Sequence, residues 1–200
     1  MKLYGNAASP FARKCRVIVH ELAMQVEIVP VAAARDDETL RRLNPLKKIP
    51  ILILDDGSAL FDSPVICEYL NEQGGGKFFP GMSIWRGTSG RWKALGLQAL
   101  ADGIMDAAVA CRYETTQPEG RSNPDHVARY RATIAAGIDA LERVTFNETP
   151  TIGEIACACA LGYLDFRYAD LAWRDTRPKL AAWFEKFSEY PSMQATQPGV

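Results

Sequence analysis

The sequence predicts a small α/β domain followed by a larger domain built from helices alone. Two observations support this prediction. Strand-like and helix-like patterns alternate over residues 1–76, whereas no convincing strand follows the segment GGGKFFPGMS, whose Gly and Pro residues mark a linker. The second domain is expected over residues 84–200. A chain of 200 residues with 48% hydrophobic side chains is long enough to bury the cores of one or two domains.

In the first domain, the order of elements follows from apolar spacing and turn residues. Phe11, Cys15, Ile18 and Leu22 recur at helical spacing after Pro10. The turn sequence DDGS between two apolar runs predicts a hairpin. Ser63-Pro64 opens a further helix, which the glycines at 74–76 stop. Strands are expected over residues 2–5, 26–31, 50–54 and 59–61, and helices over 10–24, 38–44 and 64–73.

The second domain is read as a series of long helices. The first is expected over 84–113, and Asn123-Pro124 opens the next, in which Ile134, Ile138 and Leu141 share one face with Val127 and Tyr130. Thr151 and Glu154 form a T-x-x-E capping box in front of the very apolar segment IGEIACACALGYLDFRY. A last helix carries Leu180, Trp183, Phe184 and Phe187.

Composition and charge argue against a nucleic-acid-binding, membrane-associated, secreted or metal-binding protein. A formal net charge of −1 without a long basic run gives no support to a nucleic-acid or membrane-surface role. The N-terminus lacks the apolar core of a signal peptide, and five cysteines without a framework of spacings indicate a reducing cytosol. Only two histidines, His20 and His126, are present, and there is no CxxC, so no metal is expected.

Five segments together identify a family. The chain carries SPFARKCRV, NPLKKIPIL and FDSPVICEYL in its first domain, and LADGIMDA and TIGEIACACALGYL in its second. With these segments the whole chain resembles the glutathione S-transferases, and small bacterial members in particular. The resemblance implies a thioredoxin-like domain over 1–76 that binds glutathione, and an all-helical domain over 84–200 that contributes the pocket for an electrophile. It also implies a homodimer.

Ser9 is the candidate catalytic residue. Ser9-Pro10 reads as a helix start, where the Ser9 hydroxyl accepts a hydrogen bond from a backbone N–H. The hydroxyl still has a hydrogen to donate, and a thiolate above it would also feel the field of the helix N-terminus. The resemblance gives this position the role of activating the glutathione thiol. The alternative is that Ser9 only caps the helix.

Three cations follow Ser9 at Arg13, Lys14 and Arg16, where a helix start favours anions instead. Two explanations stay open. The cations could raise the potential over a pocket for anionic glutathione, or they could form a solvated face.

Two further segments are candidate binding elements. In KKIP, Ile49 before Pro50 is pushed into an extended conformation, in which its N–H and C=O could pair with a peptide ligand. The resemblance implies a cis Pro50, and Lys48 or Lys47 could meet the glycyl carboxylate of glutathione. In DSP, Asp62 could bind the γ-glutamyl ammonium and Ser63 the γ-glutamyl carboxylate, although Ser63 could be an N-cap only.

Other candidates come from the helical domain. The resemblance makes Asp102 a residue that reaches a partner's γ-glutamyl amine, while an ion pair with Arg91 or Arg112 is the alternative. Phe11, Tyr113 and Tyr163 are candidates for the electrophile pocket.

The predicted function is conjugation of glutathione, as co-substrate, to a small hydrophobic electrophile, in a detoxifying role. Glutathione-dependent peroxidase or isomerase activity uses the same thiolate. A non-catalytic glutathione-binding or regulatory protein on the same scaffold is the alternative from another class.

Overall fold

The computed structural model describes residues 1–31, 38–81 and 90–199. Its first domain holds a four-stranded mixed sheet in the order β2-β1-β3-β4. β1 (Lys2–Gly5) runs parallel to β2 (Glu27–Pro30), while β3 (Ile51–Ile53) is antiparallel to both β1 and β4 (Ala59–Leu60). This is the predicted thioredoxin-like arrangement, in which β3 and β4 form the expected hairpin.

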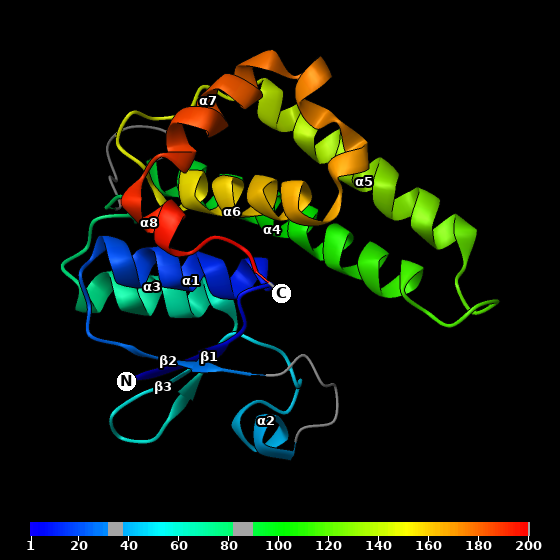
Figure 1. Cartoon of the computed structure of the whole chain (residues 1–200). Coiled ribbons are helices and arrows are strands. Elements are labelled where there is room, and N and C mark those ends of the chain that lie inside the picture. Colours follow the sequence, from blue (N-terminus) through cyan, green and yellow to red (C-terminus); the bar gives the residue numbers. More distant parts are fainter. Residues whose placement is uncertain (32–37, 82–89, 200) are drawn as a thin grey trace.

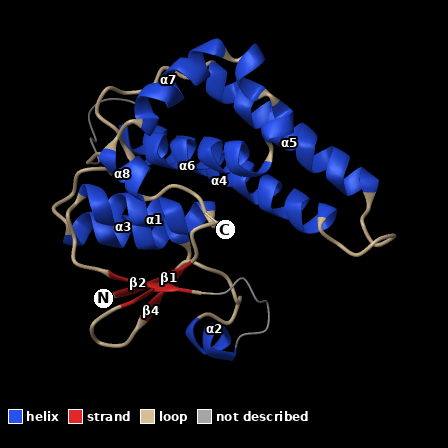
Figure 2. Ribbon diagram, viewed as in Figure 1, coloured by secondary structure: helices blue, strands red, loops and turns tan. Residues whose placement is uncertain are grey.

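Helices cover both faces of the sheet (Figures 1 and 2). α1 (Pro10–Glu21) and α3 (Ser63–Gln73) lie side by side on the face turned toward the second domain, and α2 (Glu38–Leu43) lies on the other side. The apolar spacing seen in the sequence explains this layer. Cys15, Ile18, Ile66 and Leu70 are fully buried between the helices and the sheet.

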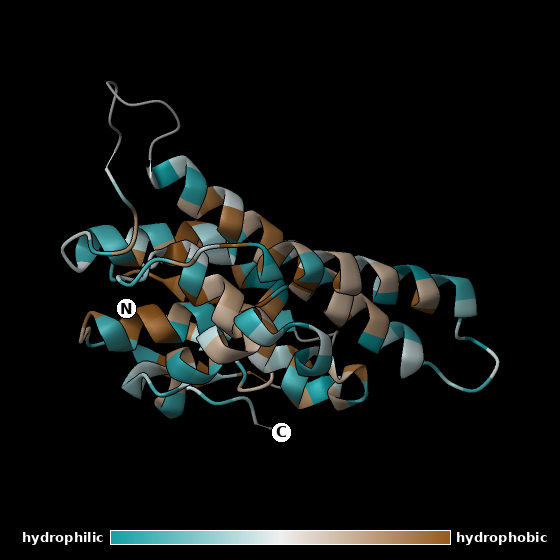
Figure 3. Cartoon of the chain, turned by 90° about the horizontal axis from the view of Figure 1, so that it is seen from above, coloured by the Kyte–Doolittle hydropathy of each residue, from teal (hydrophilic) through white to brown (hydrophobic). Residues whose placement is uncertain are grey.

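The second domain is helical, and α4 (Gly90–Thr115) packs on α5 (Pro124–Glu142) and α6 (Ile152–Arg167). α7 (Pro178–Ser188) and α8 (Pro191–Ala195) follow, after two short 3-10 turns, η1 (Ala169–Leu171) and η2 (Trp173–Thr176). In Figure 3 the loop joining α4 and α5, at the right of the view, is hydrophilic, in keeping with an exposed connection. The expected two-part fold is therefore confirmed.

Local capping signals were good guides to helix starts. Asn123 caps α5, and both halves of the Thr151–Glu154 capping box are formed at α6. Glu154 is itself buried, and its other carboxylate oxygen accepts hydrogen bonds from the backbone and side chain of Asn147 at 3.1 and 2.9 Å. Thus the capping carboxylate also fixes the loop that leads into α6.

Some boundaries differ from the prediction. α1 ends at Glu21 rather than near residue 24, because Ala23 has a positive φ of 49°, which an α-helix does not allow. α3 begins with Ser63, and its N-cap is Asp62 rather than Ser63. α8 was not predicted. The predicted start of the long helix at 84–89 lies outside the described residues.

α4 also has the length and composition of a membrane-spanning helix. Its apolar residues are nevertheless used inside the protein. Ala101, Met105, Ala108 and Cys111 are buried, and α4 packs on two neighbouring helices. We therefore interpret α4 as the central core helix of the second domain.

Two of the three cations after Ser9 join the two domains. Arg13 and Lys14 are buried, with 5% and 0% of their surfaces exposed. Arg13 Nη2 donates to the carbonyl of Met193 at 3.0 Å, which ties α1 to α8. The prediction of a solvated face is therefore wrong for Arg13 and Lys14, and neither residue lines the cavity described below. Arg16 is half-buried.

Candidate functional site

A cavity of about 580 Å³ lies between the two domains. Its walls come from loops and from residues of α1 and α2 in the first domain, and from α4 and α6 in the second. The first domain contributes Asn6, Ala8, Ser9, Pro10, Phe11, Leu40, Lys47, Lys48, Ile49 and Asp62. α4 contributes Asp106, Val109, Ala110, Arg112 and Tyr113, Thr116 follows directly after α4, and α6 contributes Tyr163 and Arg167. Most of the residues proposed from sequence are therefore brought together.

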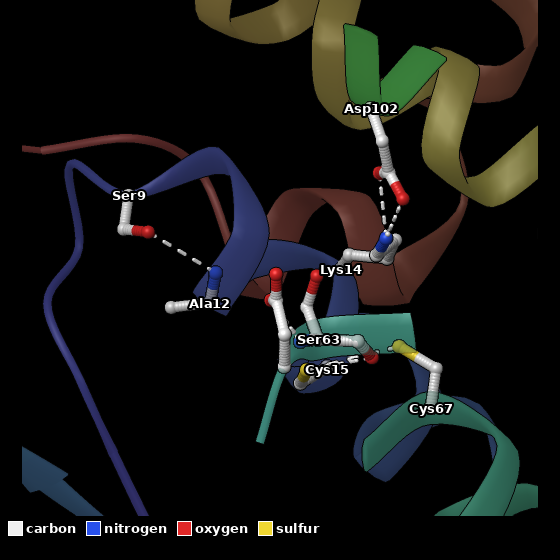
Figure 4. A network of polar contacts seen from close by, with 8 residues as sticks. Ser9, Ala12, Lys14, Cys15, Ser63, Cys67 and Asp102 are labelled. Atoms are coloured by element: carbon white, nitrogen blue, oxygen red, sulfur yellow. Dashed lines mark hydrogen bonds and ion pairs between the residues drawn. The ribbon is translucent and has the colours of Figure 1, made fainter. Parts of the chain in front are cut away.

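Ser9 lies at this cavity as the N-cap of α1. Its Oγ accepts a hydrogen bond from the backbone N–H of Ala12 at 3.2 Å (Figure 4). Asn6 holds Ser9 in place, because Asn6 Oδ1 accepts a hydrogen bond from the Ser9 backbone N–H at 2.8 Å. Within the described part of the chain, no residue accepts a hydrogen bond from Ser9 Oγ. The hydroxyl can therefore cap the helix and donate to a ligand at once.

Lys48 and Ile49 are presented by a loop that buried Asn44 organises. Asn44 Nδ2 donates to the carbonyl of Lys48 at 3.0 Å, and Asn44 Oδ1 accepts from the Leu46 N–H at 3.0 Å. The Ile49–Pro50 peptide bond is cis, as the resemblance implies. Pro50 is buried beneath the loop and does not line the cavity. Among the described residues, none forms a hydrogen bond with the main chain of Ile49.

Asp62 and Ser63 occupy different depths. Asp62 lines the cavity and accepts a hydrogen bond from the Ser63 N–H as the cap of α3. Ser63 is fully buried behind it, and its Oγ has no hydrogen-bond partner in the described structure. Buried hydroxyls are normally hydrogen-bonded, so a buried Oγ without a partner calls for an explanation such as a ligand.

Asp102 faces away from the cavity toward α1. Its two carboxylate oxygens lie 2.6 and 2.9 Å from Lys14 Nζ (Figure 4). Asp102 therefore forms an ion pair, which was the alternative to a role in ligand binding. Its partner is Lys14 instead of Arg91 or Arg112. Arg91 pairs with Glu68. One turn along α4, Asp106 lines the cavity in place of Asp102, and burial raises the pKa of its carboxyl despite the opposing effect of Lys48.

The electrophile side was only partly predicted. Phe11, Tyr113 and Tyr163 line the cavity as expected, and burial raises the pKa of Tyr163 although Arg112 and Arg167 oppose it. Sequence reasoning missed Arg112 and Arg167 as lining residues. The available signal was helical spacing, since Arg167 follows Tyr163 by one turn on α6.

Comparisons with known proteins agree with this geometry. The sequence pattern of the glutathione S-transferase N-terminal domain matches residues 8–73, and that of the C-terminal domain matches residues 124–186. An uncharacterized GST-like protein of Escherichia coli, YibF, is 32% identical over 99% of this chain and 98% of its own length.

The chain belongs to the glutathione S-transferase family. A family member from Pseudomonas fluorescens Pf-5, solved with bound glutathione, is 40% identical, with a TM-score of 0.87 over 100% of this chain and 99% of its own. A structure of a Pseudomonas fluorescens Pf-5 member with bound S-(propanoic acid)-glutathione is 39% identical, with a TM-score of 0.80 over 100% of both chains. In this family member, the cavity is lined by residues of both domains.

Proposed function

We propose that this protein is a glutathione transferase in which Ser9 activates the thiol of bound glutathione for attack on an electrophile. One observation carries the proposal. A single cavity joins the free donor of Ser9, the Ile49 main chain and the Asp62 carboxylate, which are groups suited to a thiolate, a peptide unit and an ammonium. Lys48 lies beside them for a carboxylate.

Two further findings support glutathione as the ligand. The unpartnered Ser63 hydroxyl behind Asp62 would be satisfied by a γ-glutamyl carboxylate. The Pseudomonas relative binds glutathione, and the second structure holds an S-substituted glutathione, which is the kind of product that conjugation yields. We also propose that the protein is cytoplasmic, because its five cysteines are free and buried.

The decisive measurement is the ultraviolet thiolate absorbance of bound glutathione as a function of pH. If Ser9 donates to the thiolate, the pKa of bound glutathione should lie below the value near 8.5 of an ordinary thiol, and Ser9→Gly should raise it. Superimposable titrations in the wild type and Ser9→Gly would assign the activating role to another group. Glutathione binding without turnover of any electrophile would place the protein among non-catalytic members.

Ser9→Ala and Ser9→Gly separate catalysis from capping. Glycine is nearly as good an N-cap as serine, whereas alanine costs about 1 kcal/mol of stability. Both variants lack the hydroxyl. We therefore expect equal losses of turnover but a lower free energy of unfolding only for Ser9→Ala.

A further inference from the structure

One part of the cavity is lined by two arginines that the glutathione-binding groups do not explain. Arg112 comes from α4 and Arg167 from the last residue of α6. Asp106, which lies near Asp62 and Lys48, is six residues before Arg112. An α-helix rises about 1.5 Å per residue, so Arg112 is about 9 Å further along α4. The arginines therefore lie beyond the groups assigned to glutathione.

Neither arginine has an acidic partner within ion-pair distance among the residues the structure describes. Arg167 Nε is buried without a hydrogen-bond acceptor, and its guanidinium lies 3.8 Å from the centre of the Phe166 ring. Several arginines outside the cavity have partners, although half-buried Arg16 has none among the described residues. Arg13, Arg91, Arg131, Arg174 and Arg177 donate to Met193, Glu68, Asp170, Asp165 and Asp139, respectively. Arg112 and Arg167 thus line the cavity without a counter-ion in the described structure, unlike the four of these arginines that pair with carboxylates.

The two guanidinium groups also act on each other. Burial lowers the pKa of Arg167, and the neighbouring charge of Arg112 lowers it further. Both charges oppose the rise in the pKa of Tyr163 that burial causes. Tyr163 lines the same cavity, one turn before Arg167 on α6. An anion bound here would remove this repulsion and supply the missing acceptor for Nε.

The surroundings are suited to an organic acid. Tyr113, Tyr163 and Phe11 provide ring surfaces in the same cavity, whereas Val109 and Ala110 provide aliphatic surface. Guanidinium groups bind the two oxygens of a carboxylate through parallel hydrogen bonds. The site thus combines an apolar wall with a carboxylate receptor.

We propose that the electrophile carries a carboxylate, which Arg112 and Arg167 bind. This inference rests on the proposed transferase function, and it replaces the purely hydrophobic electrophile expected from the sequence. In the reaction, the glutathione sulfur forms the new bond to carbon and the leaving group departs with its bonding electrons. The arginines only orient the acid, so they are specificity residues that take no part in bond exchange.

The kinetic test uses two matched aryl halides, a chloronitrobenzoate and the corresponding chloronitrobenzamide. Sulfur displaces chloride in both, and only the first is anionic. After correction for the uncatalysed rates, we expect kcat/KM to favour the acid by about tenfold or more, as for a charge-assisted hydrogen bond. Arg112→Gln/Arg167→Gln should abolish this preference, whereas Arg143→Gln, at an exposed arginine outside the cavity, should retain it.

A binding test separates this inference from the proposed catalysis. Calorimetry should show that S-carboxyethylglutathione binds about tenfold more tightly than S-propylglutathione, and that the double variant binds them equally. That result would support the inference even if neither halide were turned over, an outcome that would reject only the catalytic proposal.

Three results would overturn the inference. These are equal affinities of the two S-substituted glutathiones in the wild type, a preference that survives in the double variant, and a loss of affinity for unsubstituted glutathione in the double variant. The last would mean that the arginines bind the carboxylates of glutathione itself.

Discussion

Lys14 on α1 and Asp102 on α4 form a salt bridge that joins the two domains, with Nζ 2.6 and 2.9 Å from the two carboxylate oxygens. The lysine side chain is completely buried, while 17% of the Asp102 side chain is exposed. Burial alone would lower the pKa of Lys14, but Cys67 and Asp102 raise it, and the net shift is upward. The lysine is therefore held in its charged form.

Removing only the anion should destabilise the protein strongly. Asp102→Asn leaves the buried ammonium without a counter-ion, and we expect the free energy of unfolding in urea to fall by about 3–5 kcal/mol. Lys2→Met is the matched control, because the ion pair of Lys2 with Glu27 is exposed and its urea midpoint should stay unchanged. A loss below about 1 kcal/mol in Asp102→Asn would contradict a stabilising role for the pair.

Asp62→Asn should weaken glutathione binding without unfolding α3. Asparagine is as good an N-cap as aspartate, but it lacks the charge that would pair with the γ-glutamyl ammonium. We expect the Kd from calorimetry to rise about tenfold to hundredfold, at an unchanged urea midpoint. An unchanged Kd would remove Asp62 from the binding site.

The buried thiol of Cys159 should make the protein less stable at alkaline pH. Burial raises the pKa of Cys159 from 9.0 to about 11. Between these values the unfolded chain has lost the thiol proton and the folded chain has kept it, so the free energy of unfolding falls as pH rises. At about 1.4 kcal/mol per unit, the total is roughly 2–3 kcal/mol.

Cys159→Ala should therefore make the fall in stability between about pH 9 and 11 shallower without abolishing it, because burial also raises the pKa of Cys15 and Cys157, while the slope near neutral pH stays unchanged. The measurement is urea unfolding at a series of pH values. Parallel curves for the wild type and the variant would show that Cys159 does not titrate differently in the two states.

We expect a homodimer in solution, as the family resemblance implies. Trp92 and Val65 expose 57% and 49% of their surfaces, and the Arg91–Glu68 ion pair links the two helices that carry them. Sedimentation at micromolar concentration should give twice the chain mass of 22.1 kDa. Trp92→Glu should shift the equilibrium toward monomer, and a wild type that sediments only as monomer would refute the expectation.

The sequence was sufficient where the determining contacts are local. A capping residue acts within one turn, so Asn123 and Thr151 marked the starts of α5 and α6 correctly. Apolar spacing likewise identified the buried faces of α1 and α5. For the candidate site, the family segments were needed to single out Ser9, Ile49 and Asp62, which line one cavity.

Contacts between segments far apart in the sequence could not be predicted. Lys14 and Asp102 are 88 residues apart, and Arg13 and Met193 are 180 residues apart, so nothing beside these cations indicated that they are buried. Arg112 was considered only as a partner for Asp102, and Arg167 was not singled out, because both lie near helix C-termini, where a cation is favoured by the helix dipole alone. Only the packing of α4 against α6 brings them to the same cavity.

The bond from Arg13 to the Met193 carbonyl has a consequence for synthesis of the protein. Arg13 belongs to the helix that Ser9 caps, and Gly199 N–H donates to the carbonyl of Ala7 at 3.4 Å in the loop just before Ser9. While the ribosome is still translating the helical domain, both of these attachments are missing. The region around Ser9 therefore keeps only local contacts, such as those of Ser9 with Asn6 and Ala12, until residue 199 has emerged.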